Sequence, residues 1–203
     1  MNKFFYLASQ SPRRKEILDQ LRAPYQLLKL VEGPNSAADF DETPLKNENP
    51  VDYVRRAALL KADAGWKYLV RHDLEQAPVL AIDTKVTVNN NILGKPEDAT
   101  HARVMLRRLS GRSHQVLTAV TMKFGDTVVR ELSTTDVKMK KLEDNEIEAY
   151  IGTGEPFGKA GGYGIQGIAS IFISHIAGSY SGVVGLPIYE TSELIKKFGF
   201  SLL

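Results

Sequence analysis

The sequence contains no cysteine among its 203 residues. This absence excludes a disulfide framework, thiolate metal sites and a cysteine nucleophile. No apolar run approaches the roughly 20 residues that a helix needs to cross a bilayer. The apolar run at residues 4–8 is too short for the core of a signal peptide. These absences predict a cytoplasmic protein with no membrane partner.

An excess of charge of one sign is also missing. The 26 Lys and Arg residues nearly balance the 24 Asp and Glu residues, which gives a formal net charge of +2. Lys138, Lys140 and Lys141 form only a small basic patch, with no aromatic platform beside them to stack on bases. We therefore expect no nucleic-acid partner, whereas an anionic small molecule is compatible with the mild basicity.

No internal repeat or low-complexity linker divides the chain. The length favours one globular domain over residues 1–203, and it leaves room for two lobes around a central cleft. Apolar patterns predict strands at 4–8, 25–31, 79–82, 115–124, 127–138 and 168–176, and helices beginning at Pro12 and at 51–64, 99–109, 143–150 and 189–198. Residues 85–93 are typical of a hairpin, and residues 33–39 of an exposed loop. Gly125-Asp126, between the strands at 115–124 and 127–138, is typical of a hairpin turn. The expected fold is α/β, with a mixed, curved central sheet flanked by helices.

The first candidate site follows the predicted strand at residues 4–8. There the sequence reads Ser9-Gln10-Ser11-Pro12-Arg13-Arg14, with Ser11 as the expected N-cap and Pro12 at the first helical position. Free backbone N–H groups at a helix start attract anions, and arginines add donors for phosphate oxygens. A capped helix with solvated arginines is the competing interpretation. Because adjacent arginines oppose the helix dipole at this end, we favour an anion partner.

The second candidate site is a set of acids and lysines, namely Asp41, Glu42, Lys61, Asp83 and Lys95. Metal-assisted phosphoryl chemistry needs carboxylates to hold a divalent cation and to orient water, and cations to neutralise phosphates. Each of these residues, taken singly, is more often a solvated surface group. Asp83 differs because it directly follows the predicted strand at 79–82, at the carboxyl end where α/β folds place ligands.

The glycine-rich stretch after residue 152 contains two misleading patterns. Residues 162–167 match a dinucleotide fingerprint by letter but do not open a strand-helix-strand unit, and residues 154–159 are one residue short of a phosphate loop. We reject both interpretations. These glycines either let the backbone approach a ligand closely or form structural turns.

Six motifs follow one another along the chain. They are Leu7-Ala8-Ser9-Gln10-Ser11-Pro12-Arg13-Arg14, Asp83-Thr84, Gly94-Lys95-Pro96, Leu109-Ser110-Gly111, Lys159-Ala160-Gly161-Gly162-Tyr163-Gly164-Ile165-Gln166-Gly167 and Gly185-Leu186-Pro187. Together they resemble the Maf family of nucleotide pyrophosphatases from end to end. The resemblance implies a fold like that of the inosine triphosphate pyrophosphatases, a divalent cation (Mg²⁺ or Mn²⁺), a homodimer, and cleavage of a nucleoside triphosphate between its α- and β-phosphates.

The resemblance also implies roles for individual residues. Asp83 would be the general base or the metal-linked activator of water. The other site residues would hold the phosphates (Ser11, Arg13 and Arg14) or complete the polar site (Glu42, Lys61 and Lys95), and Glu42 and Asp83 would bind the metal. Glu32 is the other candidate for the family's glutamate. Counting back from Lys61, and taking Asp41-Glu42-Thr43-Pro44 as the family's acidic pair, favours Glu42.

Three positions distinguish the substrate branches of the family. Arg14, Thr84 and Gln166 resemble the branch that acts on dTTP and UTP, whereas the 7-methyl-GTP branch has Trp-Arg, Asp-Gln and a glutamate near the position of Gln166. A neutral amide suits a pyrimidine edge that carries both donors and acceptors. The resemblance therefore implies a dTTP/UTP pyrophosphatase. The alternatives are a 7-methyl-GTP pyrophosphatase and a non-catalytic nucleotide sensor that affects cell division or septum formation.

Lys85 departs from the family pattern, which usually has an apolar residue at this position. Strand alternation places Lys85 on the same side as Asp83, where it would compete with a metal for the carboxylate. Alternatively, the strand twists and Lys85 reaches solvent. The first arrangement is the one feature of the sequence that favours a sensor over an enzyme.

Overall fold

The structure is a computed structural model that describes residues 3–31 and 40–202. The predicted loop at 33–39 and the alternative site residue Glu32 lie outside the described residues. The strands are β1 (Phe5–Leu7), β2 (Tyr25–Leu27), β3 (Val79–Val88), β4 (Asn91–Leu93), β5 (Ser113–Phe124), β6 (Thr127–Met139) and β7 (Ile173–Ala177). The helices are α1 (Pro12–Gln20), α2 (Pro50–Arg71), α3 (Ala99–Leu109), α4 (Asp144–Gly152), α5 (Tyr180–Val184) and α6 (Ile188–Lys196), with short 3₁₀ helices η1 (Ala160–Gly162) and η2 (Ile168–Phe172).

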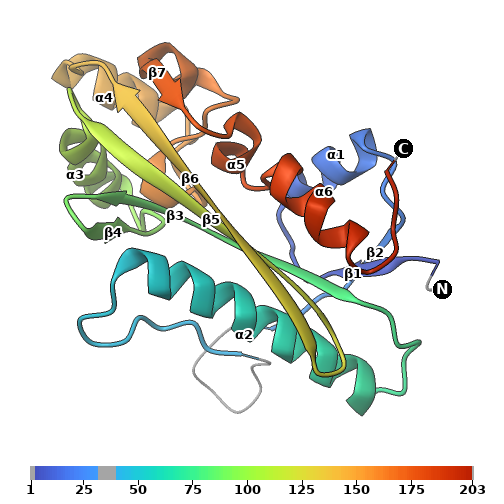
Figure 1. The fold of residues 1–203 in the computed structure, drawn as a ribbon. Helices are drawn as coiled ribbons and strands as arrows, with labels where there is room; N and C mark the ends of the chain where they lie inside the picture. The colour runs from blue at the N-terminus through green and yellow to red at the C-terminus, as the bar shows by residue number, and fades with distance from the viewer. Residues whose placement is uncertain (1–2, 32–39, 203) are drawn as a thin grey trace.

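All seven strands belong to one sheet in the order β2-β1-β3-β5-β6-β7, and β4 pairs with β3 beside that path. β1 runs parallel to β2 and β3, whereas the remaining pairs are antiparallel. Helices lie on both sides of the sheet (Figure 1). The predicted α/β fold, with a mixed central sheet flanked by helices, is therefore confirmed.

The long strands β3, β5 and β6 form the spine of the sheet (Figure 1). β5 and β6 pair along their whole length, and the predicted Gly125-Asp126 turn joins them. Gly125 has a φ of +58°, a conformation that favours glycine because it lacks a Cβ. β3 pairs with β5 from Val79 to Thr87. The spine therefore connects the two ends of the molecule.

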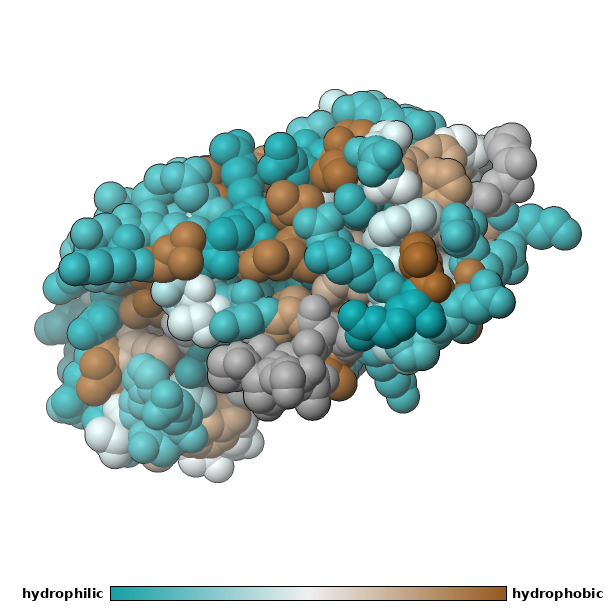
Figure 2. Space-filling view, turned by 90° about the horizontal axis from the view of Figure 1, so that it is seen from below, coloured by the Kyte–Doolittle hydropathy of each residue, from teal (hydrophilic) through white to brown (hydrophobic). Residues whose placement is uncertain are grey.

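Helix α2 packs along one face of this spine (Figure 1). Asn49 caps its first turn by accepting a hydrogen bond from the Asp52 N–H, and Pro50 follows at the first helical position. α2 approaches β3 closely at Gly65, where a Cβ would lie 2.7 Å from Val79 Cγ1. Seen from this side, apolar residues lie scattered among hydrophilic ones (Figure 2). Among the helices of the described residues, none is long and apolar enough to cross a membrane.

The opposite face of the spine carries two separate apolar cores. One core joins α1 and α6 to Leu80 and Ile82 of β3. The other joins α3 and α4 to Val86 and Val88 of the same strand. Thr84 lies between these two pairs, on the same face by strand alternation. A polar interval therefore separates the two cores at the middle of β3.

Three predicted strands have clearly different boundaries in the structure, and the strand predicted at 25–31 ends at Leu27. The strand predicted at 79–82 continues to Val88, so Asp83 lies in the middle of β3 and not at its carboxyl end. The strand continues because β5 supplies hydrogen-bonding partners almost to its end. The strand predicted at 168–176 begins only at Ile173. Residues 168–172 form η2 instead, whose Ile168 and Ala169 N–H groups donate to the Glu155 carboxylate.

Candidate active site

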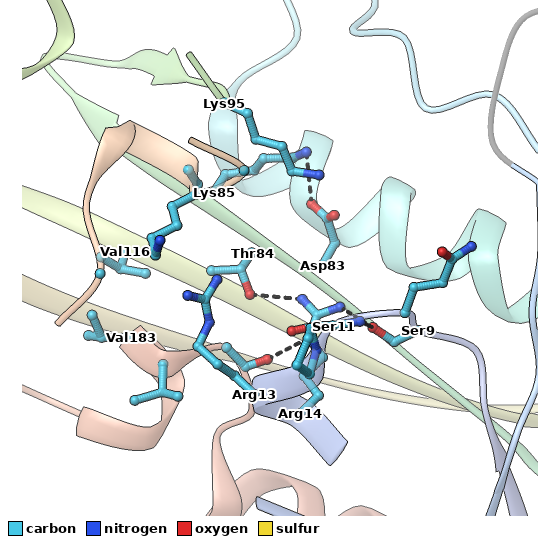
Figure 3. Close-up of a pocket in the computed structure, with 18 of the residues that line it drawn as sticks. Ser9, Ser11, Arg13, Arg14, Asp83, Thr84, Lys85, Lys95, Val116 and Val183 are labelled. Carbon is cyan, nitrogen blue, oxygen red and sulfur yellow. Dashed lines mark hydrogen bonds and ion pairs between the residues drawn. The ribbon is translucent and has the colours of Figure 1, made fainter. Parts of the chain in front are cut away.

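The edge of β3 that faces β1 is open at its middle. β1 pairs with Val79 and Leu80 and β4 pairs with residues 86–88, so no strand of the described chain covers residues 81–85 on this edge. A cavity of about 730 Å³ lies here, and residues 83–86 all line it (Figure 3). Because successive side chains of a strand point to opposite faces, an open edge lets one cavity reach all four.

The cavity brings together the residues to which the resemblance assigned roles. These residues come from segments far apart in the chain and are Ser11, Arg13, Arg14, Glu42, Lys61, Asp83, Thr84, Lys95 and Gln166. Asp41 of the second candidate site does not line the cavity; it is exposed, and its carboxylate accepts hydrogen bonds from Thr43. The cavity is also lined by Lys159, to which the sequence analysis assigned no role. In the sequence, only its membership of the motif at residues 159–167 indicated that Lys159 belongs to the cavity. The roles of all these residues stay predictions.

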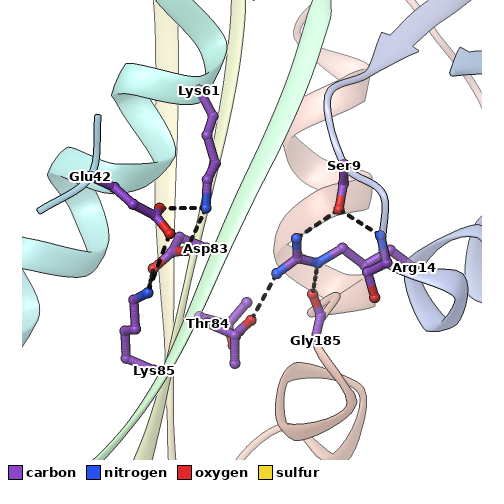
Figure 4. A network of polar contacts seen from close by, with 10 residues as sticks. Ser9, Arg14, Glu42, Lys61, Asp83, Thr84, Lys85 and Gly185 are labelled. Carbon is purple, nitrogen blue, oxygen red and sulfur yellow. Dashed lines mark hydrogen bonds and ion pairs between the residues drawn. The ribbon is translucent and has the colours of Figure 1, made fainter. Parts of the chain in front are cut away.

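The first polar group in the cavity is the carboxylate cluster, formed by Glu42, Lys61, Asp83 and Lys85 (Figure 4). Lys61 Nζ, from α2, lies 2.7 Å from Asp83 Oδ1 and 2.6 Å from Glu42 Oε2. Lys85 Nζ lies 3.5 Å from Asp83 Oδ2 and 3.7 Å from Glu42 Oε1. All four side chains are at most 15% exposed. Two carboxylates and two ammonium groups therefore balance one another in a largely buried place.

Lys85 points into this cluster and not to solvent, as strand alternation predicts. Its ammonium group also lies 4.9 Å from the centre of the Tyr53 ring, close enough for a cation–π contact. Burial is the largest influence on the Lys85 pKa and lowers it, but the carboxylates of Asp83 and Glu42 outweigh burial and leave the pKa above its ordinary value. Lys85 is therefore charged at neutral pH.

On the other face of β3, Arg14 connects three segments in what we call the Arg14 junction, formed by Ser9, Arg14, Thr84 and Gly185 (Figure 4). Arg14 Nε donates to the Gly185 carbonyl at 2.8 Å. Its Nη1 donates to Ser9 Oγ at 2.8 Å and its Nη2 to Thr84 Oγ1 at 3.2 Å. Burial lowers the pKa of Arg14 to about 10, against an opposing effect of the Asp83 charge. The guanidinium therefore stays charged at neutral pH, with neutral oxygens as hydrogen-bond partners.

Helix α1 begins at the cavity. Ser11 is its N-cap, and the Ser11 side chain makes no capping hydrogen bond. Arg13 Nε is buried and has no hydrogen-bond partner among the described residues. Burial lowers the pKa of Lys159, and the charge of Arg13 lowers it further. Cations that repel one another beside a helix N-terminus indicate a binding place for a polyanion.

A further part of the cavity wall is apolar. Val86, Val116 and Tyr163 contribute to it, and Gln166 lies nearby in sequence as an exposed amide that also lines the cavity. The Tyr163 hydroxyl lies 2.7 Å from Nε2 of the buried His114. Burial lowers the pKa of His114 to about 4, so this imidazole is neutral at neutral pH. An apolar wall with an adjustable amide suits a nucleobase.

Glu42 and Asp83 are the acids of this cavity that could hold a divalent cation. Asp83 Oδ2 is buried and has no hydrogen-bond partner in the described part of the chain, so it can serve as a ligand oxygen. Across the described residues, no group of three or more acids and histidines is placed to hold a metal. Two carboxylates nevertheless fit Mg²⁺, which is usually bound through one or two carboxylates together with substrate phosphates and water.

Comparison with known proteins identifies the family. The family model described as "Maf-like protein" matches residues 4–198. This chain belongs to the Maf family. A relative in Nitrosomonas europaea, named dTTP/UTP pyrophosphatase, is 49% identical over 197 residues, which cover 97% of this chain and 95% of the relative. A Chromobacterium violaceum protein of the same name is 50% identical over 197 residues, with 97% and 96% covered.

The Maf resemblance inferred from six motifs is thus confirmed over nearly the whole chain. Among solved structures, the Staphylococcus aureus Ham1 protein aligns with a TM-score of 0.44 and 16% identity, over 68% of this chain and 72% of the Ham1 chain. The assignment to the Maf family rests on the sequence matches and not on this alignment.

Proposed function

We propose that this Maf-family protein hydrolyses dTTP and UTP to the nucleoside monophosphate and pyrophosphate. Relatives close to half identical along nearly their whole length bear the name dTTP/UTP pyrophosphatase. The observation that carries the proposal is that one cavity holds both a paired carboxylate cluster and a set of cations at a helix N-terminus. Anhydride hydrolysis needs both groups, because water must be activated while a polyphosphate is held.

In the proposed reaction, water attacks the α-phosphorus. A bond forms between the water oxygen and phosphorus, the bond from phosphorus to the bridging α–β oxygen breaks, and pyrophosphate leaves with the electron pair. Asp83 accepts the proton of the water. Lys61 Nζ lies 2.7 Å from Asp83 Oδ1, so Oδ2, which makes no hydrogen bond within the described residues, would accept this proton. Arg13, Lys95 and the start of α1 hold the phosphates, and Ser11 and Arg14 frame that end of the cavity.

A divalent cation, Mg²⁺ or Mn²⁺, would bind to Glu42 and Asp83 together with phosphate oxygens. It would supply neutralisation of the charge that develops on the leaving pyrophosphate. Gln166 would read the base, since its amide offers one acceptor and two donors to a pyrimidine edge. Modified pyrimidine nucleotides belong to the same substrate class. The homodimer, the cytoplasmic location and the single domain over residues 1–203 stay predictions from the sequence.

One observation favours a second candidate, a nucleotide sensor without catalysis. Lys85 contacts the Asp83 carboxylate that would accept the proton. A sensor would bind nucleotide and release no product. We favour the enzyme because Asp83 lines the cavity beside both lysines, and its Oδ2 makes no hydrogen bond within the described residues and so keeps an acceptor for a proton.

The test is a panel of dTTP, UTP, CTP, GTP and 7-methyl-GTP, with Mg²⁺, with Mn²⁺ and with a chelator. We expect pyrophosphate and monophosphate as products, and a kcat/KM for dTTP or UTP at least about tenfold above that for 7-methyl-GTP. Tight dTTP binding without turnover under every condition would instead establish the sensor. A preference for 7-methyl-GTP would assign the protein to that other branch.

A further inference from the structure

The two lysines of the carboxylate cluster occupy different oxygens of the same two acids. Lys61 Nζ lies 2.7 Å from Asp83 Oδ1 and 2.6 Å from Glu42 Oε2, within direct hydrogen-bond distance. Lys85 faces the remaining pair, Asp83 Oδ2 and Glu42 Oε1, at 3.5 and 3.7 Å. The ammonium group of Lys85 therefore lies farther from the carboxylates than that of Lys61 does, and it faces one oxygen of each acid.

Asp83 and Glu42 are also the residues that would hold a divalent cation. Asp83 Oδ2 is buried and makes no hydrogen bond within the described residues, and Glu42 Oε1 faces the same ammonium group. A cation between the two carboxylates would thus be drawn to the place that Lys85 faces. The Lys85 ammonium group and a divalent cation would compete for the negative charge of the same two carboxylates. Tighter contact with Lys85 therefore means weaker binding of the cation.

Lys85 is held in this place by more than charge. Its side chain starts on β3 two residues after Asp83, on the face that α2 covers. It is 15% exposed, and the Tyr53 ring of α2 lies 4.9 Å from its ammonium group. A lysine that is enclosed on one side by an aromatic ring and on the other by two carboxylates has little freedom to leave for solvent.

We propose that Lys85 is a resident cation of the Asp83–Glu42 pair, which makes the nucleotide-free protein a weak binder of Mg²⁺ and Mn²⁺. The inference rests on the proposed function in that it takes this acid pair as the metal site. It adds that the cluster is neutral before substrate arrives. Metal then enters together with the nucleotide, whose phosphates supply further oxygen ligands.

The test measures Mn²⁺ binding to the nucleotide-free protein, from the electron paramagnetic resonance signal of free Mn²⁺. Replacing Lys85 by methionine keeps most of the length of the side chain and removes its charge. We expect the dissociation constant for Mn²⁺ to fall about tenfold or more in Lys85→Met. Lys85→Arg, which keeps the charge, should bind Mn²⁺ as weakly as the wild type does.

The matched control is Lys159→Met, which removes a positive charge from the same cavity outside the carboxylate cluster. Its Mn²⁺ dissociation constant should change by less than about threefold, because the charges that act on Lys159 are those of Arg13 and Glu155 and not those of the two acids. Lys85→Gln provides a second neutral variant should the methionine variant fail to fold.

Equal or weaker Mn²⁺ binding in the folded neutral variants, relative to the wild type, overturns the inference. If Lys159→Met tightens Mn²⁺ binding as much as Lys85→Met does, the inference is also overturned. The effect would then come from the net charge of the protein and not from the position of Lys85. The measurement contains no nucleotide, so its outcome is separate from that of the hydrolysis panel. A wild type that releases no pyrophosphate refutes the proposed function and leaves the competition between Lys85 and metal measurable.

Discussion

The two faces of β3 meet the same cavity with different chemistry (Figure 4). On the α2 face, the carboxylate cluster consists of two acids and two lysines whose charges balance. On the opposite face, the Arg14 junction has one guanidinium that donates to a carbonyl and two hydroxyl oxygens. In the proposed function, the first group accepts a proton and holds a cation. The second joins three segments and keeps one charge throughout.

This difference shows how one strand can serve both chemistry and architecture. Successive side chains of β3 point to opposite faces, so Asp83 and Thr84 enter different surroundings although they are neighbours in sequence. We therefore expect changes in the carboxylate cluster to affect turnover most. Changes in the Arg14 junction should affect the free energy of unfolding, and the predictions below test this division.

The largest expected effect is on turnover. Asp83→Asn removes the proton acceptor and should lower kcat by about 10²- to 10⁴-fold. The control is Asp63→Asn, which removes an acid of α2 that pairs with Lys123 at 3.0 Å outside the cavity. Its kcat should stay within about twofold of the wild type, as expected for an ion pair near the surface. Steady-state pyrophosphate release measures both, and an undiminished rate in Asp83→Asn would falsify the catalytic role.

The second effect is on stability at the Arg14 junction. Arg14→Met leaves the Gly185 carbonyl and two hydroxyl groups without their donor, and should lower the free energy of unfolding by about 3–4 kcal/mol. Arg13→Met is the matched variant, because Arg13 Nε has no partner to lose among the described residues. Urea unfolding should show a loss below about 1 kcal/mol there. Equal losses in the two variants contradict a structural role particular to Arg14.

The third effect concerns stability in acid and His114, the buried partner of the Tyr163 hydroxyl. The pKa of His114 is about 4 in the folded protein, because of burial, against 6.5 ordinarily. Between these values, only the unfolded state binds the proton, so the free energy of unfolding falls as pH drops from 6.5 to 4 and is unaffected above 6.5. This loss should reach about 3 kcal/mol.

His114→Phe should remove this part of the acid sensitivity, while Arg14, whose charge does not change in this range, contributes none. Urea unfolding at several pH values measures the difference between wild type and variant. Parallel curves for the two proteins would show that His114 takes up its proton in the folded state as well.

The smallest effect separates two threonines of the same strand. Thr84 Oγ1 accepts a hydrogen bond from Arg14 and lies 3.1 Å from Thr118 Oγ1, so Thr84→Val should lower the free energy of unfolding by about 1 kcal/mol. Thr87 Oγ1 is buried and has no hydrogen-bond partner among the described residues. Thr87→Val should therefore be neutral or slightly stabilising. If the two substitutions cost the same, the Arg14 junction does not depend on Thr84.

Where packing follows a local pattern of residues, the sequence was sufficient to predict the secondary structure. Helix α3 has the predicted bounds, and its buried residues have the spacing of one helical face, namely Ala102, Met105, Leu106 and Leu109. The hairpin of β5 and β6 also turns at the predicted Gly125. Helical spacing and turn preference are properties of neighbouring residues, so they can be detected without knowing the partners.

The sequence also indicated most members of the site, because the six motifs can be recognised one by one. Glu42 and Lys61 lie outside the motifs, and the resemblance assigned them to the site. The tertiary structure decided their contacts. β3 runs past Asp83 because a partner strand, β5, continues beside it, and the cavity exists because β1 ends early on the other edge. The pairing of Glu42 with both lysines, and of Arg14 with Gly185, joins segments that lie far apart in the chain. Such contacts depend on how distant elements pack, which no local pattern of residues specifies.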